Sequence, residues 1–274
     1  MEIKPLTGAL GAEVIGADIS QADQFDALHA AFVEHSVLVI RSQTCTPDDH
    51  LAFAQRFGPI NVNRFFKAAP ENPAIALVLK EANQREAIGE GWHTDHSYDQ
   101  IPAMGSILRA IELPPFGGDT VFVSMAAAFE ALSPTMKDFV SGLTAVHSSR
   151  HAFGPSIKDS EGARTGRYVN PEEATQDASH PVVIRHPLSG RRGLYVNPVF
   201  TTNIEGLAPE ESAAVLEMLY RHCERPDFQC RVRWSPGDIT IWDNRATWHK
   251  AINDYHGHRR LMHRVTVEGV ALSA

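Results

Sequence analysis

Hydrophobic positions in the second half of the chain fall into short runs that glycine and proline often separate. Short apolar runs bounded by turn residues are typical of β-strands, whereas helices need longer stretches with a period of about 3.6 residues. The predicted strands cover residues 106–111, 120–123, 182–186, 194–197, 229–234, 239–242 and 261–267. This succession of short strands predicts a mostly β fold with flanking helices, either a β-sandwich or a jelly-roll barrel.

The first third of the chain and a few later segments carry other patterns. Residues 1–20 alternate around several glycines and predict a short hairpin. Thr46 followed by Pro47 is typical of the start of a helix. Further strands are predicted at 37–40 and 74–79. The predicted helices cover residues 24–35, 47–57, 124–132, a segment that begins at 133–134, and the strongly amphipathic range 209–222.

Residues 148–180 show no clear periodicity and are rich in Ser, Gly, Asp, Glu and Arg. A stretch of this length without regular elements is often a lid or a binding loop. The sequence shows no repeats and no long low-complexity linker. We therefore expect a single domain over residues 1–274, with a lid or insert around 148–180.

The composition is that of a globular protein, because 43% of the 274 residues are hydrophobic and 21% are charged. A net charge of −8 disfavours a general nucleic-acid-binding surface. Three widely spaced cysteines argue against a disulfide framework. The sequence shows neither a signal peptide nor an apolar run of ~20 residues. We therefore expect a cytoplasmic protein that binds neither nucleic acid nor membranes.

The run Trp92-His93-Thr94-Asp95 and the distant His249 have the residue types of a metal site. On an extended strand, His93 and Asp95 would point to one side because side chains alternate. A second imidazole would complete the two-histidine-one-carboxylate set of non-haem Fe(II) oxygenases, which leaves one face of the metal open. Since the chain has 14 histidines, any single one is more often a surface or hydrogen-bonded residue than a ligand.

At these residues the chain resembles the Fe(II)/2-oxoglutarate dioxygenases of the taurine dioxygenase and 2,4-dichlorophenoxyacetate dioxygenase group. Besides the Trp-His-Thr-Asp run, the motifs that carry the resemblance are Leu6-Thr7-Gly8-Ala9-Leu10-Gly11-Ala12-Glu13, Arg56-Phe57-Gly58-Pro59, Gly117-Gly118-Asp119-Thr120, Val196-Asn197-Pro198, Phe200-Thr201-Thr202 and Trp242-Asp243-Asn244-Arg245. The resemblance covers nearly the whole chain. It implies a double-stranded β-helix, which is a jelly-roll barrel, and a hydroxylating enzyme that releases succinate and carbon dioxide.

The resemblance also implies the cofactors and the residues that bind them. His93, Asp95 and His249 match the Fe(II) ligands. Thr120 and Arg260 match the pair that binds the distal carboxylate of 2-oxoglutarate, the cosubstrate used together with O2. A planar guanidinium suits this task because it binds a carboxylate through two parallel hydrogen bonds. The competing interpretations are that Thr120 is an ordinary strand threonine and that Arg260 forms a surface salt bridge.

For the main substrate, the resemblance points to Arg264, Asn63, Phe153 and Phe200. Arg264 matches an arginine that holds an anionic headgroup, and on a strand it would share a face with Arg260. Phe153 and Phe200 match positions that line the substrate pocket, although ordinary apolar packing explains them nearly as well. Asn63 stands where taurine dioxygenase has a substrate-binding histidine.

The chain departs from taurine dioxygenase at three positions near the site. Asn63, Phe66 and Gly89 replace a histidine, a tyrosine and an asparagine. These changes argue against taurine, and the residues before Trp92 look closer to the aryloxyalkanoate-type members. We expect a small anionic substrate, either a sulfonate, an alkyl sulfate or an aryloxyalkanoate, that is oxidised next to its heteroatom. Family members commonly form homo-oligomers, so we also expect a dimer or tetramer.

Two other classes of protein fit part of the pattern. A cupin-like divalent-metal hydrolase or isomerase could use the same His/Asp/His site, but it would have no need of Arg260. A non-catalytic ligand-binding barrel would have no need of all three metal ligands. A His-Glu-x-x-His motif, which would indicate a zinc protease, does not occur in the sequence.

Overall fold

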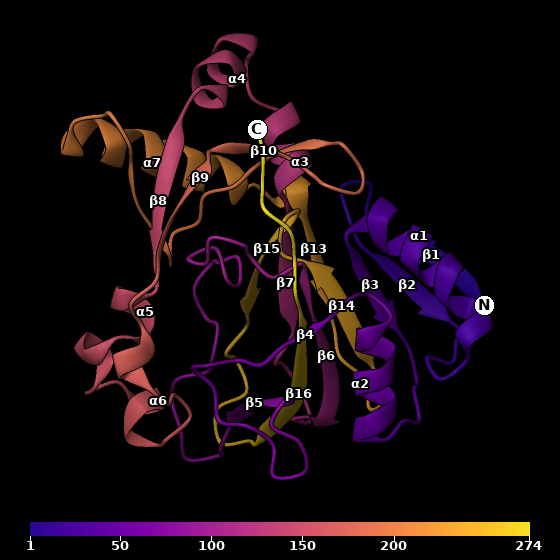
Figure 1. Ribbon diagram of the computed structural model, residues 1–274. Helices are drawn as coiled ribbons and strands as arrows, with labels where there is room; N and C mark the ends of the chain where they lie inside the picture. Colours follow the sequence, from indigo (N-terminus) through magenta and orange to yellow (C-terminus); the bar gives the residue numbers. More distant parts are fainter.

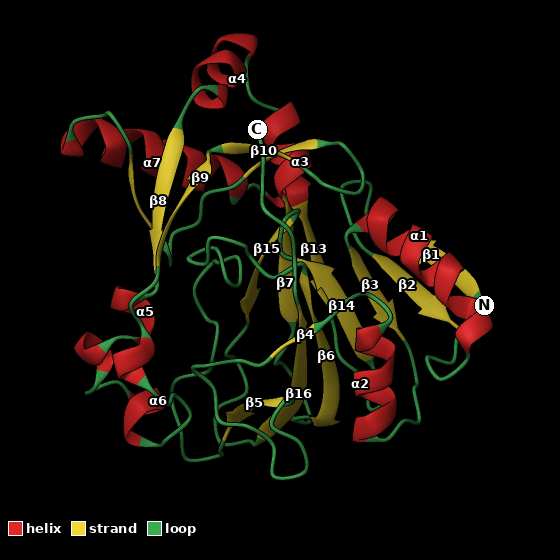
Figure 2. Ribbon diagram, viewed as in Figure 1, coloured by secondary structure: helices red, strands yellow, loops and turns green.

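The computed structural model describes residues 1–274 and is built around two β-sheets, with helices on their outer sides (Figures 1 and 2). The larger sheet has eight strands in the order β1-β2-β3-β14-β6-β16-β4, and β5 also pairs with β16. Its strands are β1 (Glu2–Pro5), β2 (Ala12–Ile15), β3 (Val37–Ile40), β4 (Ile60–Asn61), β5 (Ala76–Lys80), β6 (Gly105–Glu112), β14 (Ile239–Asp243) and β16 (Arg260–Val267).

The second sheet has three antiparallel strands in the order β13-β7-β15. Its strands are β7 (Thr120–Ser124), β13 (Gln229–Val232) and β15 (Thr247–Ala251). Two small sheets accompany it, the three-stranded β12-β8-β9 and the hairpin β10-β11. Their strands are β8 (Thr144–Ser148), β9 (Asp177–Pro181), β10 (Val183–Arg185), β11 (Arg192–Leu194) and β12 (Thr201–Ile204). The chain is therefore mostly β, as the hydrophobic pattern predicts.

Hydrophobic side chains from both main sheets form one common core cluster. Leu108 of β6, Phe122 of β7 and Trp242 of β14 are among its buried members. Because side chains alternate along a strand, Ile239 and Ile241 of β14 face the other way and belong to a separate cluster under the helices. The larger sheet is thus covered on both faces, which explains why its central strands read as continuous hydrophobic runs.

The helices are α1 (Phe25–His35), α2 (Pro47–Gln55), α3 (Met125–Glu130), α4 (Pro134–Ser141), α5 (Arg150–Phe153), α6 (Glu161–Arg164) and α7 (Pro209–Cys223). The predicted start of α2 is confirmed, since the Thr46 hydroxyl accepts from the Asp49 amide and the Asp49 carboxylate accepts from the Thr46 amide. The apolar side of α7 packs through Leu216 and Leu219 into the same cluster as Trp248 of β15. None of the helices is long and apolar enough to cross a membrane.

Some local expectations are wrong. The strand expected at 194–197 ends at Leu194, because its partner β10 begins at Val183, opposite that residue. The range 148–180 is not devoid of regular elements, since it contains α5 and α6 and the start of β9. Helices of four residues are too short to show a period, and β9 is largely polar, so neither carries a hydrophobic signal.

Candidate active site

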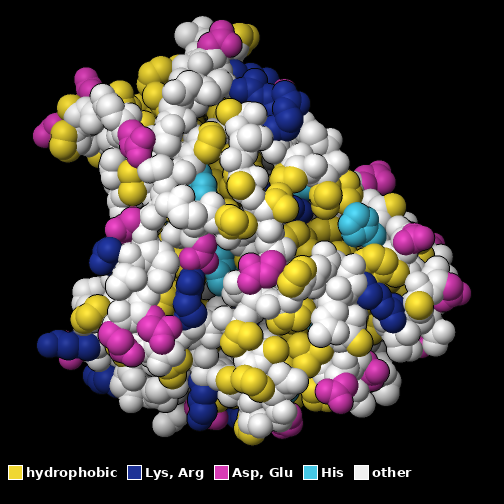
Figure 3. Space-filling model, viewed as in Figure 1, with side chains coloured by type: hydrophobic (Ala, Val, Ile, Leu, Met, Phe, Trp, Pro, Cys, Tyr) yellow, Lys and Arg dark blue, Asp and Glu magenta, His cyan; other side chains and the backbone are white.

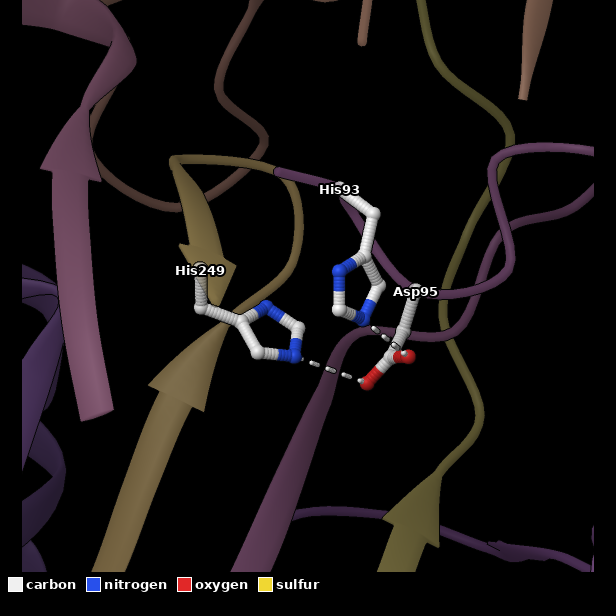
Figure 4. A group of neighbouring side chains, drawn as sticks. All are labelled: His93, Asp95 and His249. Carbon is white, nitrogen blue, oxygen red and sulfur yellow. Dashed lines mark ion pairs between the residues drawn. The ribbon is translucent and has the colours of Figure 1, made fainter. Parts of the chain in front are cut away.

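Three buried side chains, His93, Asp95 and His249, converge on one point (Figure 4). Their ligand atoms all lie within 4.8 Å of one another. Nε2 of His93 is 3.6 Å from Oδ1 of Asp95, and Nε2 of His249 is 3.8 Å from Oδ2. These separations are longer than hydrogen bonds, so the three groups surround a common point rather than pairing with each other. Two imidazoles and a carboxylate in this arrangement could hold a divalent metal ion.

The backbone brings the two histidines together through a single β-bridge. The His93 amide donates to the His249 carbonyl at 3.1 Å, and the His249 amide donates to the His93 carbonyl at 2.9 Å. The His93 and Asp95 side chains do point to the same place, as expected, but they do not share a regular strand, because His93 lies in an isolated bridge and the chain turns at Asp95. The turn continues at His96, which has a positive φ of 60°.

Neighbouring groups fix the orientation of each ligand. Nδ1 of His93 lies 2.7 Å from the Gly91 carbonyl, so it carries the proton and leaves the Nε2 lone pair free. The His249 ring lies against the rings of Trp242 and Phe122, with centroids 4.7 and 5.9 Å away. These two aromatic rings therefore hold the His249 imidazole in place.

The carboxylate of Asp95 has two further partners. The Ser106 hydroxyl donates to its Oδ2 at 3.0 Å, and Nη1 of Arg264 lies 3.3 Å from both oxygens. Sequence reasoning missed Ser106, because a serine within a predicted strand gives no signal of its contact.

The protonation states suit a metal cation. Burial lowers the pKa of the His93 and His249 imidazoles, so both rings are neutral near neutral pH. Burial raises the pKa of the Asp95 carboxyl, but the Arg264 guanidinium and the two imidazoles lower it more, and the net pKa lies below its usual range. Metal ligands must be deprotonated, and all three are.

A first cavity extends from the histidines to Thr120 and Arg260. Arg260 is only 4% exposed, yet its Nε and Nη2 have no hydrogen-bond partner. The Trp234 indole donates to the Thr120 hydroxyl at 3.1 Å and fixes the side chain of this threonine. A buried guanidinium without a partner is costly unless an anion occupies the space beside it. The closed end of this cavity, where Arg260 lies, could therefore hold an anion such as a carboxylate.

Gly118 lets the Arg260 side chain lie where it does. A Cβ atom at position 118 would lie 3.2 Å from both Cδ and Nε of Arg260. The glycine also has a φ of +70°, which other residues rarely adopt. The two-glycine turn that forms part of the sequence resemblance thus leaves room for the side chain of the predicted anion-binding arginine.

A second cavity lies on another side of the metal site and is lined by Phe153, Phe200 and Arg264. The further aromatic residues in its wall are Phe66 and Tyr168. Its wall also includes the ligands His93 and Asp95, and the two cavities share Ile88, Gly89, His93 and Arg264. The structure therefore brings both predicted phenylalanines to the wall of one pocket.

Arg264 lies between the two cavities. Its side chain is 5% exposed, and its guanidinium carbon lies 4.6 Å from the centre of the Phe66 ring. Its Nε has no partner, so one donor is free for an anion. Arg260 and Arg264 both line the first cavity, which confirms that the two arginines share a face of β16.

Asn63 does not line either cavity, contrary to what its alignment with a substrate-binding histidine suggests. Its side-chain oxygen accepts hydrogen bonds from the amides of Phe65 and Phe66, at 2.9 and 3.0 Å. Asparagine often stabilises turns in this way. The residue that reaches the pocket from this loop is Phe66, and Asn63 shapes the turn that presents it.

The molecular surface mixes both charge signs with scattered hydrophobic side chains (Figure 3). Lysine and arginine side chains gather in only small groups on the face shown, interspersed with aspartate and glutamate. This view therefore offers no extended basic surface of the kind that nucleic-acid binding requires.

The sequence matches the family described as "Taurine catabolism dioxygenase TauD, TfdA family" over residues 2–266. It is 34% identical to an alpha-ketoglutarate-dependent sulfate ester dioxygenase of Pseudomonas putida, over 98% of this chain and 90% of that protein. It is 32% identical to an alkylsulfatase of Acinetobacter baylyi, over 98% of this chain and 85% of that protein.

The fold is also found in solved structures. A putative alpha-ketoglutarate-dependent taurine dioxygenase from Burkholderia xenovorans superposes with a TM-score of 0.84 at 33% identity, covering 100% of this chain and 94% of that one. AAD-2, solved in complex with Mn(II) and N-oxalylglycine, superposes with a TM-score of 0.82 at 25% identity, with both chains fully covered (100% each). The chain therefore belongs to the TauD/TfdA family and is a 2-oxoglutarate-dependent non-haem iron dioxygenase.

Proposed function

We propose that this dioxygenase hydroxylates a small organic anion at the carbon next to its heteroatom. The substrate would be a sulfonate, an alkyl sulfate or an aryloxyalkanoate. The observation that carries this proposal is Arg264, the only lysine or arginine in the wall of the second cavity. One buried cation beside a wall of aromatic rings suits a substrate with one anionic group and an apolar body.

The roles of the site residues follow from the two cavities. His93, Asp95 and His249 would hold Fe(II), and Thr120 with Arg260 would bind the distal carboxylate of 2-oxoglutarate. Bound iron supplies the redox chemistry by which O2 converts 2-oxoglutarate to succinate and carbon dioxide and hydroxylates a substrate C–H bond. Because the chain belongs to this family, the alternative of a cupin-like hydrolase or isomerase is set aside.

The chain's own residues bind, orient and exclude water. Arg260 would fix one end of the cosubstrate through two parallel hydrogen bonds, so that its other end faces the metal site. Arg264 would hold the substrate anion, while Phe153 and Phe200 would pack against its apolar body. For an alkyl sulfate, hydroxylation of the carbon that bears the sulfate oxygen gives an unstable adduct. That adduct breaks its C–O bond to release an aldehyde and sulfate.

The segment at residues 148–180 would act as the lid of the second cavity. It contributes Phe153 and Tyr168 to the cavity wall. Its α6 is bound to the segment just before the cavity residues 87–91, because the Glu161 carboxylate accepts from the amides of Arg85 and Glu86 at 2.9 and 2.8 Å. The whole chain, residues 1–274, would form one dioxygenase domain with the double-stranded β-helix fold. The two main sheets that share a hydrophobic core support this architecture.

The test is a panel of sulfonates, alkyl sulfates and aryloxyalkanoates, scored by substrate-dependent release of succinate. We expect turnover of members with an apolar body and none of the matching neutral alcohols. Arg264→Met should raise the KM for the substrate far more than the KM for 2-oxoglutarate. Turnover of taurine but not of the apolar anions, or equal effects of Arg264→Met on both KM values, would contradict the proposal.

A further inference from the structure

Lys80 ends β5 directly beside the arginine at the closed end of the first cavity. In the antiparallel pairing of β5 with β16, Lys80 is the Cα partner of Arg260. Directly opposed residues in such a pair project to the same face of the sheet. Val78, two residues earlier on β5, lines the first cavity and confirms which face this is. The two strands lie side by side at the bottom of Figure 1.

The Lys80 ammonium is buried without an acidic partner. The residue is 2% exposed, and its Nζ has neither a hydrogen-bond partner nor a carboxylate within salt-bridge distance. Its single polar contact is with an aromatic ring, since Nζ lies 4.5 Å from the centre of the Tyr255 ring. Tyr255 is itself 2% exposed, so the pair is closed off from solvent.

Two buried cations therefore occupy opposed positions on neighbouring strands, and neither has a carboxylate within salt-bridge distance. Arg260 also lacks a carboxylate, and its guanidinium carbon lies 5.8 Å from the centre of the Trp234 ring. Burying one unpaired cation is costly, and burying two together is more so. The register of β5 with β16 is what links Lys80 to the arginine of the cavity. An anion at the closed end would offset the cost of both cations.

We propose that Lys80 is a positioning residue for the distal carboxylate of 2-oxoglutarate. The inference rests on the proposed role of Arg260. Nζ of Lys80 does not line the cavity. It acts by adding a second positive charge next to Arg260, on the neighbouring strand. The lysine thereby helps the enzyme to distinguish a cosubstrate with a distal carboxylate from one without.

The experiment compares the dissociation constants of 2-oxoglutarate and 2-oxopentanoate, which has the same carbon chain but no distal carboxylate. Both are measured by anaerobic calorimetric titration of the Fe(II)-loaded protein. Lys80→Met should raise the dissociation constant of 2-oxoglutarate by ~10-fold, equivalent to ~1.4 kcal/mol of binding free energy. It should change the dissociation constant of 2-oxopentanoate by less than about twofold. Thermal unfolding of the metal-free variant gives a second readout, because loss of an unpaired buried cation should leave Tm unchanged or raise it.

Lys137→Met is the matched control. Lys137 also lies over an aromatic ring, with Nζ 5.6 Å from the centre of Phe129, but it is on α4, which lies at the opposite end of the molecule from β5 (Figure 1). It loses the same charge and should leave both dissociation constants unchanged. Equal weakening of the two oxo acids by Lys80→Met, or a lowered Tm without selective weakening, would overturn the inference.

An Arg260→Met variant separates this inference from the proposed function beneath it. If Arg260→Met abolishes the preference for 2-oxoglutarate but Lys80→Met does not reduce it, only the lysine's role is wrong. If Arg260→Met leaves the preference intact, the proposed role of the arginine is wrong, and the inference about Lys80 is overturned with it.

Discussion

Gly118 offers a direct test of how the arginine at the closed end is positioned. In Gly118→Ala, the new Cβ would lie 3.2 Å from Cδ and Nε of Arg260, a separation tighter than ordinary van der Waals contact. Because Arg260 is buried, its guanidinium must shift by a few tenths of an ångström. The affinity for 2-oxoglutarate should fall by about 10-fold, since a bidentate arginine contact tolerates little displacement.

The alanine at position 118 also carries a backbone cost. Its φ of +70° lies in the left-handed region, which costs an alanine ~1 kcal/mol or more. Gly190→Ala is the matched control, because Gly190 has the same φ of +70° but a Cβ atom there would have no heavy atom within 4 Å. Urea unfolding should therefore show similar losses of unfolding free energy for the two variants.

The two variants should differ only in cosubstrate binding. Calorimetric titration with 2-oxoglutarate should show weaker binding for Gly118→Ala and wild-type binding for Gly190→Ala. Wild-type affinity in Gly118→Ala would show that the contact with Arg260 does not set the arginine's position. Weakening in both variants would show that general loss of stability, rather than this contact, explains the effect.

Three further predictions concern the metal site and stability. Ser106→Ala removes the donor to Asp95 and should weaken Fe(II) binding by ~10-fold, measured by anaerobic metal titration; unchanged affinity would contradict a role in orienting the carboxylate. Thr46→Ala removes the N-cap of α2 and should lower the free energy of unfolding, measured in urea, by ~1 kcal/mol. Thr46→Ser keeps a capping hydroxyl and should therefore retain most of the wild-type stability. Burial lowers the pKa of His50 to about 3, so the unfolded chain binds a proton at this position below ~6.5 and the folded chain does not. Unfolding free energy should therefore fall as pH drops from 7 to 5, less steeply in His50→Gln, and an identical pH slope in that variant would contradict this reasoning.

The sequence predicts the chemistry of the site better than its geometry. His93, Asp95 and His249 do converge, but His93 and Asp95 do not lie on one regular strand as the alternation argument assumed. His93 is held by a bridge to the distant His249, and Asp95 lies where the chain enters a turn. Periodicity describes regular elements only, so a site held by a turn is visible through its residue types alone.

Three of the strands that sequence reasoning missed share a physical cause, whereas β15, which carries His249 in a main sheet, is missed as well. β8, β9 and β12 form their own small sheet, and β9 reads Asp-Ala-Ser-His-Pro while β12 reads Thr-Thr-Asn-Ile. Their stability comes from pairing between segments far apart in the chain. A short polar strand carries little hydrophobic signal of its own, so only the tertiary structure reveals it. The substrate contact predicted for Asn63 is wrong for a related reason, because alignment with a family position does not show which way a side chain points.

Alternation succeeds on β16, and the pairing of that strand explains why. Every residue from Arg260 to Arg264 pairs with β5 without a shift, although the pairing with β6 on the other side is irregular between Leu261 and Met262. One regular neighbour is enough to keep the two arginines on one face. A register slip of one residue would turn both away and bring Leu261 and His263 to the cavities instead. Strand β16 thus supplies the cationic side chain of each cavity, Arg260 in the first and Arg264 in the second. Its regular neighbour β5, which keeps this register, also carries Lys80.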